Sequence, residues 1–179
     1  MHTRSLLALT AAFVFVGCDN SVTQVTPEPV PEANASVAYV VMSPAQPRVG
    51  DEVIVSVVAR SGASLGRVGS FAAALRYAPQ QLRFVAAVSL DGGLRVHNPA
   101  EAGLLRMAGA SAEGFPAGPL FAARFVVTGA SPAANLTLDV SELSSATAYQ
   151  NLIPSLRVQR GAILSNVTAG PPGTAVQRP

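Results

Sequence analysis

Residues 118 to 129 read GPLFAARFVVTG, and this stretch decides the fold class. Its apolar side chains recur at every second position, at Phe121, Phe125 and Val127, while Arg124 falls between them. Because successive side chains of a strand point to opposite faces, this period of two predicts a β-strand with one buried face. Glycine and proline at the two ends predict the turns that bound it.

The same alternation continues outward along the chain. In residues 70–77, Phe71, Leu75 and Tyr77 share one face and Arg76 lies on the other. The predicted strands cover residues 38–42, 52–60, 70–77, 82–90, 94–98, 104–109, 119–128, 135–140 and 156–164. Nine short strands in about 130 residues predict an all-β fold, a two-sheet β-sandwich with jelly-roll topology, whose Phe-bearing faces form the core.

Composition excludes several classes of protein. Of the 179 residues, 49% are hydrophobic and 12% are charged, which is too apolar for a disordered chain. All 12 basic residues are arginine, and loss of Arg4 with a signal peptide leaves 11 against 10 acids. A net charge near +1 predicts no nucleic-acid partner. The single cysteine excludes an intrachain disulfide and a multi-thiolate zinc site.

The N-terminus predicts export. The apolar run of residues 6–16 is too short to cross a bilayer, so residues 1–17 are interpreted as a signal peptide. Phe15-Val16-Gly17-Cys18 resembles the bacterial lipobox, which implies lipidation of Cys18 and anchoring to the inner or outer membrane. The domain would then lie in the periplasm or at the cell surface. The alternative is that Cys18 is an ordinary residue of a signal peptide that is cleaved elsewhere.

Two segments flank the predicted sandwich of residues 37–165. Residues 18–36 carry three prolines and no aromatic side chain, which predicts a proline-rich tether between the lipidated cysteine and the domain. Residues 166–179, with Gly170-Pro171-Pro172-Gly173, have the same character and are expected to form a disordered tail.

Three stretches of the sandwich resemble the cohesin domain, the dockerin-binding module of cellulosome scaffolds and a structural relative of carbohydrate-binding modules. They are residues 48–58 with the VGDEV opening, residues 75–88, and residues 118–129. The likeness extends over residues 37–165. It implies a non-enzymatic module that docks a dockerin-like or other envelope protein, with a link to polysaccharide degradation. Dockerins carry a duplicated calcium loop, which this chain lacks.

The resemblance also implies where a partner would bind. Cohesins bind through a flat face made partly by the third, fifth and sixth strands. Carried onto this sequence, that face contains Ala72, Ala74 and Arg76 from the third strand, Arg95 and His97 or their neighbours from the fifth, and Arg106 and Ala108 from the sixth. We expect this face to be flat, alanine-rich and basic.

No group of residues predicts catalysis. Residues 62–66, GASLG, match the pattern of a hydrolase nucleophile elbow, but a strand follows them where that motif requires a helix. Metal-binding and phosphate-binding motifs are absent, so we expect no enzymatic activity, no cofactor and no metal. Two alternatives remain. One is a carbohydrate-binding module contacting polysaccharide directly, although the chain has no Trp and three Tyr for stacking sugars; the other is a purely structural envelope lipoprotein.

Overall fold

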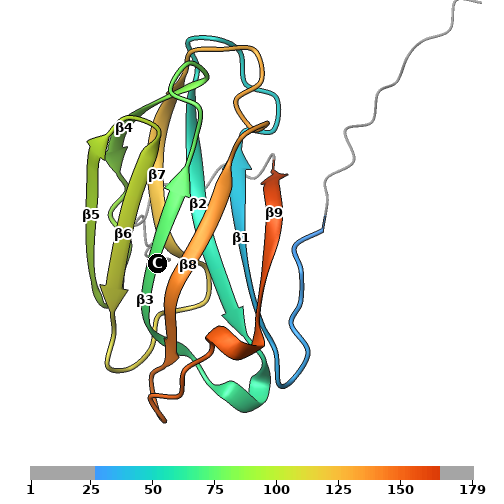
Figure 1. Ribbon diagram of the computed structural model, residues 1–179, viewed down its shortest axis with the longest axis vertical. Coiled ribbons are helices and arrows are strands. Elements are labelled where there is room, and N and C mark those ends of the chain that lie inside the picture. The colour runs from blue at the N-terminus through green and yellow to red at the C-terminus, as the bar shows by residue number, and fades with distance from the viewer. Residues whose placement is uncertain (1–26, 166–179) are drawn as a thin grey trace, which may run out of the picture.

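The computed structural model describes residues 27–165, and the predicted signal peptide, Cys18 and the C-terminal tail lie outside them. The described chain forms nine strands and two short 3-10 helices (Figure 1). The strands are β1 (Ser36–Ser43), β2 (Glu52–Ser61), β3 (Val68–Arg76), β4 (Leu82–Ala87), β5 (Leu94–Glu101), β6 (Leu104–Ala110), β7 (Pro119–Val127), β8 (Thr137–Ser145) and β9 (Leu156–Leu164). The helices are η1 (Ala63–Leu65) and η2 (Ile153–Ser155). The described residues contain no helix of the length and hydropathy that a membrane span requires.

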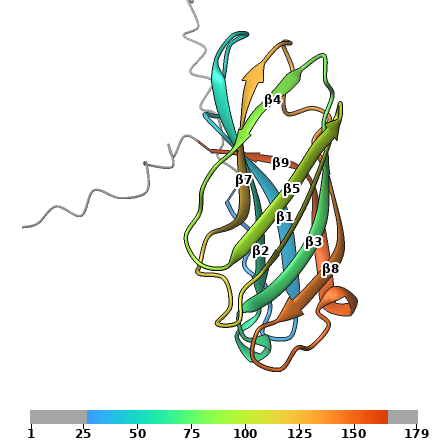
Figure 2. The same ribbon diagram turned by 90° about the vertical axis from the view of Figure 1, so that its left-hand side faces the viewer.

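The strands form two sheets, which confirms the predicted nine-stranded sandwich. One has five strands in the order β4-β7-β2-β1-β9, and the other has four in the order β5-β6-β3-β8. Strand β9 runs parallel to β1, and the other pairs are antiparallel. The edge strands β4 and β5, one from each sheet, lie on the same side of the sandwich (Figures 1 and 2). An open hollow lined by Leu90, Arg95, His97 and Phe121 lies on that side, and we call this junction of the two sheets the seam.

The core lies between the inner faces of the two sheets, as the alternation predicts. Phe71 and Leu75 of β3, Tyr77 just after that strand, and Phe121 and Phe125 of β7 are buried. The ring of Phe125 contacts the ring of Tyr77 edge-on, with centroids 5.1 Å apart. Edge-to-face packing of this kind adds to the free energy gained from apolar burial. The Phe-bearing faces are therefore the core, as predicted.

Three strands end three or more residues from the predicted position, and one of them is β5, which ends at Glu101 rather than at residue 98. Strand β4 ends at Ala87 rather than at residue 90; the Val88 amide still donates to the carbonyl of Ala122 on β7, and residues 89–93 lead to β5. Strand β8 continues to Ser145 rather than ending at residue 140. Its pairing with β3 shifts by one residue between Val140 and Glu142, so a bulge at Ser141 absorbs the break in the alternation.

The segment 27–35 packs against the domain, which corrects the prediction that the tether extends to residue 36. The hydroxyl of buried Tyr39 donates a hydrogen bond of 2.9 Å to Oε2 of Glu28, and Arg60 forms an ion pair with the same carboxylate. The Gly62 amide donates to the carbonyl of Ala35. A Cβ atom on Gly62 would collide with the carbonyl oxygens of residues 32 and 33. We call residues 27–35 the strap.

The strap contacts the outer face of the five-stranded sheet beside a second apolar cluster. That cluster contains Val37, Tyr39, Val58 and Ile163, with Val41 packed against it, and it is separate from the core between the sheets. The burial of Tyr39 raises its pKa above the usual value, and the hydrogen bond to Glu28 acts in the same direction. Nearby Arg60 opposes this shift.

The raised pKa of Tyr39 predicts a loss of stability in alkali. Above about pH 10 the tyrosine of the unfolded chain ionises, while folded Tyr39 keeps its proton. The free energy of unfolding should therefore fall as the pH rises from about 10 toward the higher pKa of the folded state. Denaturant unfolding at about pH 8 and about pH 11 should show this fall in the natural chain and a smaller one in Tyr39→Phe. Equal falls in both proteins would contradict the assignment.

Candidate interaction surface

The outer face of the four-stranded sheet can be built from its strand register, because residues directly opposite each other share a face. Four rows cross this face from β8 through β3 and β6 to β5. The rows are Ser144, Ser70, Ala110, Leu94; Glu142, Ala72, Ala108, Val96; Asp139, Ala74, Arg106, Asn98; and Thr137, Arg76, Leu104, Glu101. The expected residues Ala72, Ala74, Arg76, Arg106 and Ala108 therefore lie together on one surface.

The placement of Arg95 and His97 on this surface is wrong. His97 is opposite Met107, a core residue, so its side chain points toward the inner side of the sheet. Its ring lies 5.9 Å from the ring of Phe84 and 5.8 Å from that of Phe121, centroid to centroid. The side chain stays exposed because β5 is an edge strand at the open seam. The outward residues of β5 are its neighbours Leu94, Val96 and Asn98.

Arg95 joins the two sheets across the seam. Its Nε donates to the carbonyl of Leu120 at 2.7 Å, and its other nitrogens donate to the carbonyls of Leu90, Asp91 and Gly92. The guanidinium also lies 4.7 Å from the ring centroid of Phe115. Burial lowers the pKa of Arg95, and Asp91 partly offsets that shift. The side chain thus holds residues 90–92 against β7 and is not available to a partner on the outer face.

Replacement of Arg95 tests this structural role. Arg95→Ala should lower the free energy of unfolding by about 2 kcal/mol, because the carbonyls of buried Leu120 and half-buried Leu90 lose a charged donor. Arg95→Lys should restore little of it, since one ammonium group cannot reproduce the planar fork of a guanidinium. Arg76→Ala, which removes only an exposed ion pair, should cost less than about 1 kcal/mol. Denaturant unfolding of the three variants provides the measurement, and equal losses for Arg95→Ala and Arg76→Ala would contradict the role.

The outer face is not basic, contrary to the sequence prediction. Its two arginines are matched by three carboxylates: Arg76 pairs with Asp139 at 3.1 Å, Arg106 pairs with Glu101 at 3.4 Å, and Glu142 accepts a hydrogen bond from Ser70 at 2.6 Å. Asp139 and Glu142 join this face because β8 extends along β3. These pairs are solvent-exposed and contribute little to stability.

The surface has an apolar side and a charged side. Leu94 and Val96 on β5 are 70% and 56% exposed, and small alanines separate them from the carboxylates of β8. Exposed large apolar side chains grouped on one surface are typical of an interaction site. A flat, alanine-rich sheet also lets another backbone approach closely. This arrangement suits a partner protein that has an apolar contact region with polar groups beside it.

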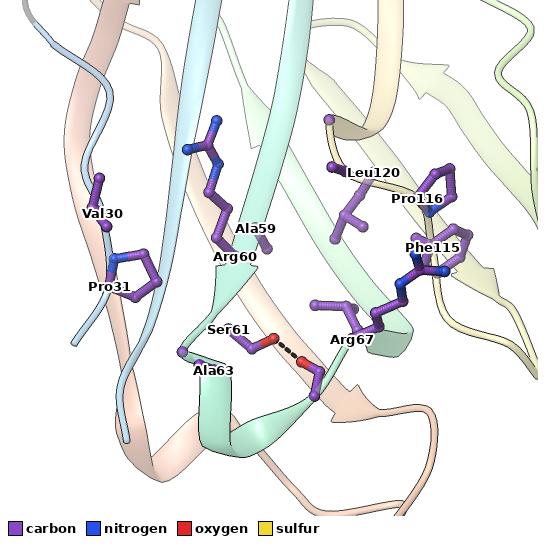
Figure 3. A pocket seen from close by; sticks show the side chains of 15 residues that line it. Val30, Pro31, Ala59, Arg60, Ser61, Ala63, Arg67, Phe115, Pro116 and Leu120 are labelled. Atoms are coloured by element: carbon purple, nitrogen blue, oxygen red, sulfur yellow. Dashed lines mark hydrogen bonds between the residues drawn. The ribbon is translucent and has the colours of Figure 1, made fainter. Parts of the chain in front are cut away.

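A separate open groove of about 650 Å³ lies at one end of the sandwich. The strap residues Val30 and Pro31 form one side, and the loop with Pro116 forms the other (Figure 3). Arg60 and Arg67 are the charged residues of its lining, which contains no carboxylate, histidine or cysteine. The Ser61 hydroxyl donates to the carbonyl of Gly66. The groove therefore lacks a pair of groups for acid–base chemistry.

The remaining candidates for chemistry are also accounted for. Ser64 lies in η1, and its hydroxyl donates to the carbonyl of Ala33, so no strand-turn-helix elbow presents it. Residues 27–165 contain no group of three potential metal ligands. Among the exposed large hydrophobic side chains of the same residues, Tyr149 is the one aromatic, because Tyr39 and Tyr77 are buried. An aromatic platform for sugar rings is therefore not found in the described part of the chain.

Neither a family model nor a curated protein matches the sequence. Solved structures do match the fold. A type II cohesin domain from the cellulosome of Acetivibrio cellulolyticus has a TM-score of 0.55 at 14% identity, with 73% of this chain and 95% of that chain covered. A non-cellulosomal cohesin from the archaeon Archaeoglobus fulgidus has a TM-score of 0.52 at 17% identity, with 70% and 87% covered. The sixth cohesin of Acetivibrio cellulolyticus scaffoldin B, in complex with a mutant Cel5 dockerin, has a TM-score of 0.51 at 13% identity, with 72% and 99% covered.

Proposed function

We propose that this chain, which has the cohesin fold, is a non-enzymatic docking module that holds a dockerin-like protein at the cell envelope through the outer face of its four-stranded sheet. The observation that carries the proposal is the composition of this outer face. Its large apolar side chains Leu94 and Val96 are exposed, and they lie beside a flat group of alanines on β3 and β6. Solved relatives in fold include a cohesin in complex with a dockerin.

The proposal includes attachment to a membrane through Cys18. The sequence around this cysteine supports lipidation, and no other cysteine is present to compete for it. More than one acyl chain on the same residue makes attachment effectively stable. The module would thus present its partner-binding face from a fixed membrane position. Incorporation of labelled palmitate into the natural protein, and its loss in Cys18→Ser, tests this part alone.

Capture of a partner tests the docking function. The chain from residue 19 onward is immobilised and exposed to the soluble proteins of its own organism. We expect retention of a specific protein that free chain displaces. A dockerin-like partner should be released by a chelator, because dockerin folding depends on its calcium loops. In parallel, the chain is mixed with insoluble cellulose, chitin or xylan. Retention on a glycan without any protein partner would overturn the proposal in favour of direct carbohydrate binding.

A further inference from the structure

The outer face of the five-stranded sheet carries four arginines, Arg60, Arg83, Arg124 and Arg157. Strand register places Arg83 and Glu52 on either side of Val126, and Arg60 and Arg157 on either side of Val37. Arg124 lies between Ala86 and Ile54. Three carboxylates accompany these four arginines: Glu52 on β2, and Glu28 and Glu32 on the strap. The opposite face of the sandwich has two arginines and three carboxylates. The two outer faces therefore differ in the sign of their net charge.

Half of the arginines on this face are not engaged by a carboxylate. Arg60 pairs with Glu28, and Arg124 approaches Glu52 at 4.0 Å. Within residues 27–165, Arg83 and Arg157 form no ion pair. Both side chains are exposed and lie far apart on the face, on the first strand and the last strand of the sheet order β4-β7-β2-β1-β9. Their charge is available to an extended anionic surface rather than to a single small ligand.

The strap brings the chain onto this same face. Glu28 holds the strap to Tyr39 and Arg60, both of which lie on the outer side of the five-stranded sheet. Cys18 precedes Pro27 by nine positions, and nine residues span at most about 30 Å even when fully extended. If Cys18 carries the lipid anchor of the proposed function, the bilayer surface lies within this reach of the basic face.

We propose that the outer face of the five-stranded sheet rests against the anionic headgroups of the membrane, with the docking face turned away from it. This inference rests on the proposed attachment through Cys18. Arginines near an anionic bilayer are attracted to it within a Debye length, about 8 Å at physiological ionic strength. The connection allows this face to come into contact with the headgroups, where the attraction acts. Because the docking face lies on the other side of the sandwich, a partner can reach it while the domain is on the membrane.

Two single-tryptophan variants measure the orientation, since the natural chain contains no tryptophan. Ala86→Trp places the reporter on the five-stranded face, and Ala72→Trp places it on the four-stranded face; both alanines are half-exposed. The chain from Cys18 onward is coupled through its one cysteine to maleimide lipid in phosphatidylcholine vesicles with or without phosphatidylglycerol. A nitroxide on the lipid headgroups quenches nearby tryptophan.

On vesicles with phosphatidylglycerol we expect at least about twofold stronger quenching of the Ala86→Trp reporter than of the Ala72→Trp reporter, and loss of this difference at high salt. The difference should also disappear after Arg83→Glu with Arg157→Glu, but persist after the matched pair Arg76→Glu with Arg106→Glu. Equal quenching of both reporters, or stronger quenching at position 72, would overturn the proposal.

Failure of this inference is distinguishable from failure of the proposed function. Chemical coupling supplies the attachment, so the orientation is measured whether or not the cell acylates Cys18, which palmitate labelling tests separately. The Arg83→Glu, Arg157→Glu variant should still capture the partner in solution, because neither residue lies on the docking face. A variant that loses orientation and keeps partner capture supports separate roles for the two outer faces, with membrane contact on the five-stranded sheet and partner binding on the four-stranded sheet.

Discussion

Replacement of Phe125 by alanine is expected to lower the free energy of unfolding by about 3 to 5 kcal/mol. The side chain is fully buried on the inner face of the five-stranded sheet, between Phe84 of β4 and Val53 of β2. Its ring packs edge-on against Tyr77 at 5.1 Å and against Phe84 at 5.7 Å, centroid to centroid. Truncation removes these contacts and leaves a cavity that β-sheet neighbours fill poorly.

Denaturant unfolding measures this loss, with Leu94→Ala as the control. Leu94 is also a large apolar residue on a strand, but it is 70% exposed, so its truncation should change the free energy of unfolding by no more than about 0.5 kcal/mol. A loss below about 1 kcal/mol for Phe125→Ala would show that the core is not packed around this ring.

A charged side chain at the centre of the docking face should abolish partner binding. Ala72 and Ala108 are opposite each other on β3 and β6, in the row that runs from Glu142 to Val96. Ala108→Arg would hold a partner away from the flat sheet and from Val96. We expect the dissociation constant to rise at least about 100-fold, the effect of losing the centre of an interface. Isothermal titration with the captured partner gives the measurement.

Ala86→Arg is the matched control for that experiment. It makes the same substitution at a half-exposed alanine on a strand, but on the outer face of the other sheet. Its partner affinity should remain within about threefold of the natural chain, and both variants should unfold within about 0.5 kcal/mol of it. Equal loss of affinity in the two variants would indicate a general effect of added charge, and unchanged affinity in Ala108→Arg would place the partner on another surface.

The alternation of side chains predicted the strands well because burial of one face imposes a period of two on each of them. The alternation predicted which residues of a strand share a face, but it did not predict which of the two faces is the outer face of the sheet. In β5 the resemblance to cohesins implied that Arg95 and His97 or their neighbours lie on the outer face, yet these two side chains point toward the seam, where backbone carbonyls contact Arg95 and aromatic rings contact His97. On an edge strand beside the seam, a polar side chain therefore does not indicate that its face is the outer one.

The other differences also have local causes. The bulge in β8 interrupts the period, so Asp139 and Glu142 could not be assigned to the outer face from the sequence. The strap was interpreted as a tether because its prolines and lack of aromatic residues give no core signal. What holds it is a polar contact, Glu28 with Tyr39 and Arg60, between residues far apart in the chain. Pairings of that kind have no periodicity to detect.

The position of β1 between β2 and β9 has a consequence for how the protein reaches its native state. The first strand pairs with the last, and the partners Ser36 and Leu156 are 120 positions apart. Closing so large a loop is entropically costly, and contacts of high sequence separation slow folding. Because the chain is synthesised from its N-terminus, β1 must wait for residues 156–164 before its pairing with β9 can form. Until then β1 exposes an unsatisfied hydrogen-bonding edge that is open to aggregation or to a chaperone.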